Sequence, residues 1–504
     1  MREKYESLSL TVLRELAKAR GMKGISALKK GDLVEAMLAQ DEKEQPVQAA
    51  AEPEKPVVTA AENGQAGAVE NRQERTEYRP VRRERSGNGE MRRERQDYNN
   101  EGRRENGENG ETRRENSDKP PVDLAQLDSG QTVSGILEVM ADGFGFIRSD
   151  NYMPGDSDVY VSPSQIRRFN LKTGDIISGN TRIKSMQEKF SALLYLKTIN
   201  GKHPAEAAKR YNFEDMTPIF PDERLRMERG SRAVAMRIVD LLSPIGKGQR
   251  GMIVSPPKAG KTTLLKEIAH SILENDPKMR LLILLIDERP EEVTDIKEAI
   301  QGENVEVIYS TFDELPEHHK RVSEMVIERA KRLVEQKENV TILLDSITRL
   351  ARAYNLTVPP SGRTLSGGLD PAALHMPKRF FGAARNMREG GSLTILATAL
   401  VDTGSKMDDV VFEEFKGTGN MELVLDRKLA EKRIFPAINI QKSSTRREDL
   451  LLTPEEREVV YALHREMGGG RSEDNVEQVM DFFKKTKTNQ ELVEVLRRSW
   501  LKRQ

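Results

Sequence analysis

The segment SPPKAGKTT, residues 255–263, has the residue types and the spacing of a phosphate-binding loop. It follows the apolar run MIVS and opens a helical stretch, and this setting makes such a match credible. Backbone N–H groups of the loop can cradle phosphates, the Lys261 ammonium can reach the β- and γ-oxygens, and the Thr262 hydroxyl can ligate magnesium. One departure is Ser255, where the common pattern has its first glycine. The candidate nucleotide contacts are Lys258, Ala259, Gly260, Lys261, Thr262 and Thr263.

Two apolar stretches further along the chain end in acidic residues. VTILL runs into Asp345, and LLILLI runs into Asp287 and Glu288. Because parallel strands bring their carboxyl ends to one edge of a sheet, we expect these acids beside the phosphate loop. Asp345 is expected to hold magnesium, and Glu288, which reaches farther than Asp287, to orient and deprotonate a water. The alternatives are that Asp345 only caps the helix beginning at Ser346 and that Glu288 only forms a surface ion pair with Arg289.

A glycine cluster, GKGQRG, precedes the strand that leads into the phosphate loop. A lone cluster of this kind is weak evidence, and a plain turn is an equally good interpretation. Its place in the chain nevertheless predicts a contribution to nucleotide binding. The candidate residues are Gly246, Lys247, Gly248, Gln249, Arg250 and Gly251.

A second group of candidates lies in DGFGFIR, residues 142–148. Its two phenylalanines are two residues apart, so on one strand they face the same side. Exposed rings of this kind form a stacking platform for unpaired bases, and we expect the small Gly143 and Gly145 to leave room for a ligand. The alternative is that the rings fill the core. The candidate contacts to unpaired bases are Phe144, Phe146, Arg148 and Tyr160.

The composition excludes several classes of protein. The 504 residues include no cysteine, so disulfides, thiolate metal sites and a cysteine nucleophile are excluded. The mean hydropathy is −0.64, and no apolar run approaches the roughly 18 residues of a membrane span. We therefore expect a cytoplasmic protein with no membrane partner. The scattered histidines predict no protein-built metal site, so that magnesium would arrive with ATP.

The periodicity of the chain predicts a multidomain α + β protein. Residues 1–40 show helical spacing, and residues 121–200 contain five short strand candidates, GILEVM, GFGFIR, DVYVSP, DIISGN and SALLYLK, enough for a small barrel. After a linker at 201–235, apolar strands alternate with helical stretches in residues 236–504, which predicts a mainly parallel sheet followed by C-terminal helices.

The predicted insertion, residues 41–120, is rich in Arg, Glu, Asn and Gly. Between residues 71 and 120 it has 13 Arg and 12 acidic side chains, and so few apolar ones that we expect disorder. It is either a solvated spacer or an arm that touches RNA phosphates. The formal net charge of zero comes from 81 basic and 81 acidic residues; because such local blocks cancel in the sum, it does not exclude a nucleic-acid partner.

Several long motifs in a fixed order resemble one family. GFGFIR with VYVSPSQIRRFNL resembles the RNA-binding domain, and SPIGKGQRGMIVSPPKAGKTTLL, LIDERPEEVTD and LLDSITRLARAYN resemble the ATPase core, of the bacterial transcription termination factor Rho family. The resemblance implies an OB-fold, cold-shock-like barrel and a RecA-like ATPase domain. It further implies a homohexameric ring that hydrolyses ATP with magnesium at subunit interfaces, moves along single-stranded RNA and releases it from RNA polymerase.

The resemblance also carries roles over to single residues. Lys261, Asp345 and Glu288 match the catalytic residues, Arg289 a nucleotide-side arginine, and Phe435 a ring that packs on the adenine. Arg446 matches the arginine finger of the neighbouring subunit, although the sequence does not separate it from Arg447. The family's primary RNA-binding site is matched by Phe144, Phe146, Arg148 and Tyr160. Two loops match those that line the central pore and contact RNA, with Thr364, Leu365, Ser366, Gly367 and Gly368 in the first and Lys406 in the second.

Two other functions remain open at this point. A RecA-like ring ATPase could act on single-stranded DNA, because base stacking alone tolerates both polymers and only contacts to the 2′-OH distinguish RNA. The chain could instead be an RNA-binding scaffold built on residues 41–120, with ATP as a regulator.

Overall fold

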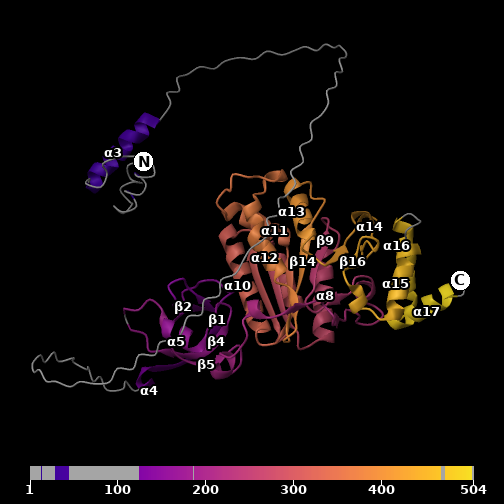
Figure 1. Ribbon diagram of the computed structural model, residues 1–504, viewed down its shortest axis with the longest axis horizontal. Coiled ribbons are helices and arrows are strands. Elements are labelled where there is room, and N and C mark those ends of the chain that lie inside the picture. Colours follow the sequence, from indigo (N-terminus) through magenta and orange to yellow (C-terminus); the bar gives the residue numbers. More distant parts are fainter. Residues whose placement is uncertain are drawn as a thin grey trace, which may run out of the picture. The chain divides into compact units, whose positions relative to one another are not determined.

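The structure, a computed structural model, describes Leu13, Ala17 and residues 29–44, 124–185, 187–466 and 472–501 (Figure 1). The chain divides into two compact units, Met1–Thr112 and Arg113–Gln504. In the first unit, helix α3 (Lys30–Glu44) buries Leu33 and Met37. The predicted insertion beyond Glu44 and most of the predicted N-terminal module lie outside the described residues.

The second unit begins with helix α4 (Leu124–Leu127) and a closed five-stranded barrel. The strands close in the order β1-β2-β3-β5-β4, so all five predicted strands are confirmed. Leu137, Ile147 and Ile177 fill the interior, and Ser162 starts helix α5 (Pro163–Phe169) with a capping box. The strands are β1 (Asp128–Val139), β2 (Gly145–Arg148), β3 (Val159–Val161), β4 (Ile176–Arg182) and β5 (Ser191–Ile199).

A larger, mainly parallel sheet follows, in the order β11-β10-β12-β14-β9-β15-β16. The apolar runs MIVS, LLILLID, VEVIYS, VTILLD and SLTILATAL all form strands of this sheet, as their alternation with helical stretches predicts. The short β15 and β16 are additions that the sequence did not reveal. Short β13 (Arg385–Met387) pairs with β14 and with β6 (Pro218–Ile219). The main strands are β9 (Arg250–Ser255), β10 (Arg280–Glu288), β11 (Val305–Thr311), β12 (Asn339–Asp345), β14 (Ser392–Leu400), β15 (Met421–Val424) and β16 (Ser444–Thr445).

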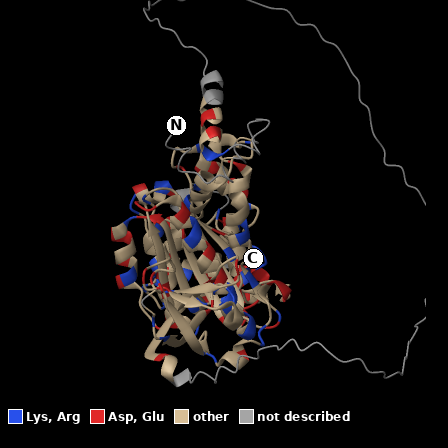
Figure 2. Cartoon of the chain, turned by 90° about the vertical axis from the view of Figure 1, so that its left-hand side faces the viewer, with Lys and Arg blue, Asp and Glu red and all other residues tan. Residues whose placement is uncertain are grey.

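Helices cover both faces of this sheet, which is why the middle parts of its main strands are apolar and the sheet is mostly tan in Figure 2. Leu281, Ile283 and Leu285 face one core, and the alternating residues 282, 284 and 286 face the other. The first core contains α7 (Val234–Leu242), α8 (Lys261–Asn275) and α9 (Pro290–Ala299). The second contains α10 (Pro316–Val334), α11 (Ile347–Thr357), α12 (His375–Gly382) and α13 (Lys406–Lys416).

Three C-terminal helices pack on the first core. Arg237 of α7 is fully buried and donates hydrogen bonds to the carbonyl oxygens of Phe483 and Thr486 at 2.6 and 2.7 Å. These bonds satisfy carbonyls at the end of α16, which have no helical partner of their own. The helices are α15 (Pro454–Glu466), α16 (Ser472–Lys485) and α17 (Asn489–Leu501).

The predicted linker, residues 201–235, contains short elements that join the barrel to the sheet. Arg210 forms ion pairs with Asp175 of the barrel, at 2.5 Å, and with Glu335 after α10, at 3.0 Å. Both carboxylates are fully buried, so this junction is fixed by paired charges inside the protein. The elements are α6 (Pro204–Ala207), η2 (Phe213–Asp215), β6, and β7 (Arg224–Leu225), which pairs with β8 (Ile245–Gly246).

Candidate nucleotide site and nucleic-acid interface

The predicted phosphate loop connects β9 to α8, as expected from its sequence. Gly260 precedes the helix with a φ of 93°, and Lys258 in the loop has a φ of 63°. A φ of this sign suits glycine and bends the chain back toward the start of α8. The free N–H groups of the first turn then face the loop, in the arrangement that binds phosphate.

Lys261 lies between the two predicted acids. Its Nζ is 2.7 Å from Asp345 Oδ1 and 3.6 Å from Glu288 Oε1. Burial by itself lowers the pKa of this ammonium, but the two carboxylates outweigh that effect, and the pKa is raised above its usual value. Lys261 is therefore a fixed positive charge at one edge of the sheet. The phosphate loop follows β9 there, and the two acids end β10 and β12.

Glu288 is only 3% exposed, so the alternative of a surface ion pair with Arg289 is wrong. The preceding Asp287 has a φ of 57° and interrupts the pairing of β10 with β11, and its carboxylate binds Arg349 of α11 at 3.0 Å. Burial, and then the charge of Asp345, raises the pKa of Glu288 to about 7. A carboxyl group with this pKa can accept a proton from water near neutral pH.

Asp345 has the surroundings of a magnesium ligand. Its Oδ1 accepts hydrogen bonds from Lys261 and from Thr398 Oγ1, the latter at 2.8 Å, while its buried Oδ2 has no hydrogen-bond partner among the described residues. The helix-cap alternative is wrong, because the Ser346 side chain caps α11. Thr262 Oγ1 lies 3.3 Å from Glu292 Oε2, so a hydroxyl and a free carboxylate oxygen, both hard donors, are available for the cation.

A cavity of about 630 Å³ extends from the phosphate loop to the C-terminal helices. The Phe435 ring, 47% exposed, stands over Gly260 at its entrance. Val234 of α7 and Met480 of α16 form apolar walls that no sequence motif revealed, since they come from distant segments. Arg289 is exposed just before α9. The lining also includes the predicted contacts Lys258, Ala259, Gly260 and Thr263.

The glycine cluster at 246–251 lies at the opposite end of β9 from the phosphate loop. Five residues at about 3.3 Å each separate Arg250 from Ser255, roughly 16 Å. Gly248 packs against the backbone of Asn386, Gln249 binds Asn420 and Lys247 binds Glu223. Within one chain this segment therefore does not flank the phosphate loop, and its contribution to nucleotide binding stays a prediction. The residues concerned are Gly246, Lys247, Gly248, Gln249, Arg250 and Gly251.

Arg446 shares that far edge with Arg250. Its backbone N–H donates to Asn420, whose own N–H donates to Arg250, and among the described residues no side chain pairs with the Arg446 guanidinium. Arg447, by contrast, binds Asp449 at 3.0 Å and stacks on the Phe220 ring. The structure thus distinguishes two arginines that the sequence left equivalent, and Arg446 is the one with free donors.

The barrel carries the predicted aromatic rings on its outer surface. Phe144, Phe146 and Tyr160 are half-buried, stand outside the barrel core, and have ring centroids 5.8 to 6.1 Å apart. Phe190, whose centroid lies 5.1 Å from that of Phe146, extends the group. Phe190 was not among the predicted rings, although it directly precedes the predicted strand SALLYLK of the barrel. We call these four rings the platform, and a groove of about 430 Å³ runs beside Phe146 and Phe190.

Arg148 differs from the expectation of an exposed RNA contact. It is 5% exposed and forms ion pairs with Glu138 and Asp158, while its guanidinium carbon lies 4.8 Å from the centre of the Phe146 ring. It therefore supports the platform from beneath. Gly145 is needed because a side chain there would meet the Glu138 carbonyl. Gly143, with a φ of 84°, makes the turn.

The two loops predicted to line a pore contact each other. Gly367, in the turn η3 (Ser366–Gly368), has a φ of 78°, and a side chain on it would meet the Met407 backbone at 2.5 Å. Lys406, at the start of α13, is exposed, and Leu365 is partly covered. The two loops therefore form one surface, whose exposed members include Thr364, Ser366, Gly367, Gly368 and Lys406.

The strand order and the position of the phosphate loop define a RecA-like ATPase, here joined to an OB-like barrel. A family model described as the Rho termination factor RNA-binding domain matches residues 133–205, and one for the nucleotide-binding domain of the ATP synthase alpha/beta family matches residues 235–445.

Curated relatives make the assignment more specific. Transcription termination factor Rho of Bacillus subtilis is 57% identical over 369 residues, covering 73% of this chain and 85% of that protein. Rho of Pseudomonas aeruginosa is 56% identical and covers 73% and 89%. The chain belongs to the family of transcription termination factor Rho, and it is an RNA-dependent ATPase of transcription termination.

A solved ATPase of a bacterial type III secretion system is 21% identical, covering 62% of this chain and 93% of that chain at a TM-score of 0.48. In the part of the chain that the structure describes, no helix is long and apolar enough to cross a membrane.

Proposed function

We propose that the chain hydrolyses ATP with Glu288 as the group that activates water and Lys261 as the group that holds the transferred phosphate. The observation that carries this proposal is the contact of Lys261 with both acids, at the edge of the sheet where β9, β10 and β12 end. A phosphate bound at the loop would pair with Lys261 in place of Glu288. The Glu288 carboxylate would then be free to contact the attacking water. Charge that develops on the γ-phosphate is then met by a preorganised ammonium.

Magnesium fits this site, because Asp345 Oδ2 is buried without a partner and the Thr262 hydroxyl stands nearby in the first turn of α8. These two side chains would hold the cation, whose charge neutralises the phosphate oxygens. Thr398 keeps Asp345 oriented through its hydrogen bond.

The site is incomplete within one chain, which supports a ring. Arg446 lies at the far edge of the sheet from the phosphate loop, so it reaches a nucleotide only when a neighbouring subunit presents one. Arg250 lies beside it and would line the same interface, which gives the glycine cluster a role across subunits. A homohexamer, as the family resemblance implies, places every Arg446 at a neighbour's phosphates.

Mixed rings test this arrangement. Subunits carrying Lys261→Ala and subunits carrying Arg446→Ala are each expected to be inactive. When they are mixed, some interfaces combine an intact phosphate loop with an intact finger, and ATP hydrolysis returns. Arg447→Ala is the matched control and stays active, because its guanidinium is tied to Asp449. No recovery on mixing would contradict a finger supplied by the neighbour.

The platform and the paired loops suit single-stranded RNA at two places. Bases stack on Phe144, Phe146, Tyr160 and Phe190, and Lys406 with the loop at 364–368 would contact phosphates in the pore. Movement along the RNA would then release it from RNA polymerase. Competition between RNA and DNA of the same sequence for the intact protein tests the polymer: equal binding of DNA contradicts RNA specificity. Location in the cytoplasm and the role of residues 41–120 stay predictions.

A further inference from the structure

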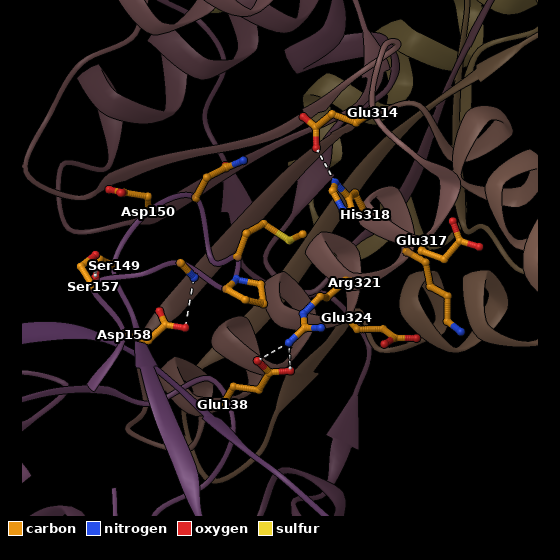
Figure 3. A pocket seen from close by; sticks show the side chains of 15 residues that line it. Glu138, Ser149, Asp150, Ser157, Asp158, Glu314, Glu317, His318, Arg321 and Glu324 are labelled. Carbon is orange, nitrogen blue, oxygen red and sulfur yellow. Dashed lines mark hydrogen bonds and ion pairs between the residues drawn. The ribbon is translucent and has the colours of Figure 1, made fainter. Parts of the chain in front are cut away.

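A cavity of about 830 Å³ lies between the barrel and helix α10. Six of the 15 residues that line it are acidic, and one ion pair crosses it, between Arg321 of α10 and Glu138 of β1 (Figure 3). Arg321 Nη2 donates to both carboxylate oxygens of Glu138, at 2.8 and 2.7 Å. Arg321 is 35% exposed and Glu138 16%, so the pair is partly shielded from water.

Glu138 connects this pair to the platform. Its Oε2 also accepts a hydrogen bond from Arg148 Nε at 2.8 Å, and Glu138 pairs across the strands with Phe146. Arg148 in turn lies against the Phe146 ring. One carboxylate is therefore shared by a cation of the ATPase domain and by the cation that supports the platform.

On its other side, α10 leads toward the nucleotide site. Tyr354 of α11 donates a hydrogen bond to Glu324 of α10 at 2.9 Å, and the two helices share one core. Arg349, one and a half turns earlier on α11, lies 3.0 Å from Asp287 and 3.6 Å from Glu288. Packed helices and ion pairs thus form a continuous path from Phe146 to Glu288.

We propose that Arg321 is a positioning residue: by holding Glu138, and through it Arg148, it fixes the platform for RNA and couples RNA binding there to ATP hydrolysis. This inference rests on the proposed function of the platform. Without Arg321, Glu138 keeps only Arg148, which Asp158 also binds, so the guanidinium beneath Phe146 shifts. The fold itself does not need Arg321, because Arg210, Asp175 and Glu335 join the domains independently.

The test uses the full-length protein with Arg321→Gln. Fluorescence anisotropy with a short single-stranded pyrimidine RNA should show binding weakened by about two- to thirtyfold, the range of such couplings. The RNA concentration that gives half-maximal ATP hydrolysis should rise by a similar factor, while hydrolysis without RNA and the Tm stay unchanged. Glu138→Gln added to Arg321→Gln should weaken binding no further than the stronger single change, because both act through one contact.

Two controls separate positioning from direct contact. The Lys320 side chain lines the same cavity but contacts the Tyr354 ring and not Glu138. Lys320→Gln therefore removes a neighbouring charge and should leave RNA affinity unchanged. The salt dependence of binding should keep its slope in Arg321→Gln, because loss of a phosphate contact reduces the slope by about 0.7 for a single strand. A reduced slope, or equal weakening by Lys320→Gln, would overturn the positioning role.

Phe146→Ala distinguishes the inference from the function on which it rests. If Phe146→Ala loses RNA affinity while Arg321→Gln binds RNA like the unaltered protein, the inference fails and the platform stands. If Phe146→Ala itself binds RNA normally, the proposed platform fails. If Arg321→Gln lowers both the Tm and the RNA affinity, Arg321→Lys, which keeps the positive charge, is the variant to compare. RNA affinity in Arg321→Lys that is no higher than in Arg321→Gln would also overturn the inference.

Discussion

The nucleotide site and the platform use charged residues in opposite ways. At the nucleotide site, the charged residues Lys261, Glu288 and Asp345 are the groups proposed to act on ATP, with Lys261 at the start of α8 and the two acids at the ends of β10 and β12. At the platform, the surfaces proposed to bind RNA are uncharged rings, and the charges of Arg148, Glu138 and Asp158 lie beneath them as supports. Charge at the first site would therefore take part in the reaction, whereas charge at the second site positions the rings.

Lys261→Ala should have the largest effect, and it tests whether charge at the nucleotide site takes part in the reaction. It removes the phosphate ligand and leaves two buried carboxylates without their cation, so kcat/KM for ATP should fall about 10³-fold or more. Steady-state ATP hydrolysis with saturating RNA measures this. Lys266→Ala is the control, since Lys266 pairs with Asp295 at the surface of the protein, and its activity should remain normal.

Glu288→Gln should separate chemistry from binding at the same site. The amide fills the same volume but accepts no proton from water, so kcat should fall about 10²- to 10³-fold. Nucleotide affinity, measured by equilibrium binding, should persist because Lys261 and the loop remain. If kcat were unaffected, Glu288 would not be the group that activates water.

Phe146→Ala tests the platform, and its effect on RNA binding should be smaller than the effect of Lys261→Ala on ATP hydrolysis. Stacking of one base contributes about 1 to 3 kcal/mol, roughly 5- to 150-fold in Kd. RNA binding should weaken accordingly, while ATP hydrolysis at saturating RNA recovers. Tyr211→Ala removes an exposed ring outside the platform, and a comparable loss in that variant would argue against a specific platform.

The smallest expected effect is the dependence of ATP hydrolysis on pH, which tests the proposed role of the buried Glu288 carboxylate. Because the pKa of Glu288 is raised to about 7, its active carboxylate form is lost as the pH falls through that value. The kcat/KM for ATP should therefore rise about tenfold between pH 6 and pH 8. In Glu288→Gln the remaining activity should be flat over this range, and a flat profile in the unaltered protein would contradict Glu288 as the base.

Local motifs predicted the nucleotide site because its parts follow directly from strand ends. The loop at 255–263 and the acids at 288 and 345 each occupy a few consecutive residues, and parallel strands bring them to one edge. The position of the glycine cluster did not follow from its nearness to the phosphate loop in sequence, because the extended strand β9 carries the two segments to opposite edges of the sheet. The supports of the platform, Glu138 and Arg321, lie 183 residues apart, and no local pattern links residues so distant.

Occupancy of the RNA surfaces is expected to drive ATP hydrolysis at the nucleotide site. The most direct measurement is the rate of ATP hydrolysis by the full-length protein with and without unstructured, pyrimidine-rich single-stranded RNA. We predict strong stimulation by RNA in the unaltered protein, and a need for more RNA in Phe146→Ala. A rate of ATP turnover that does not change when RNA is added would contradict the account.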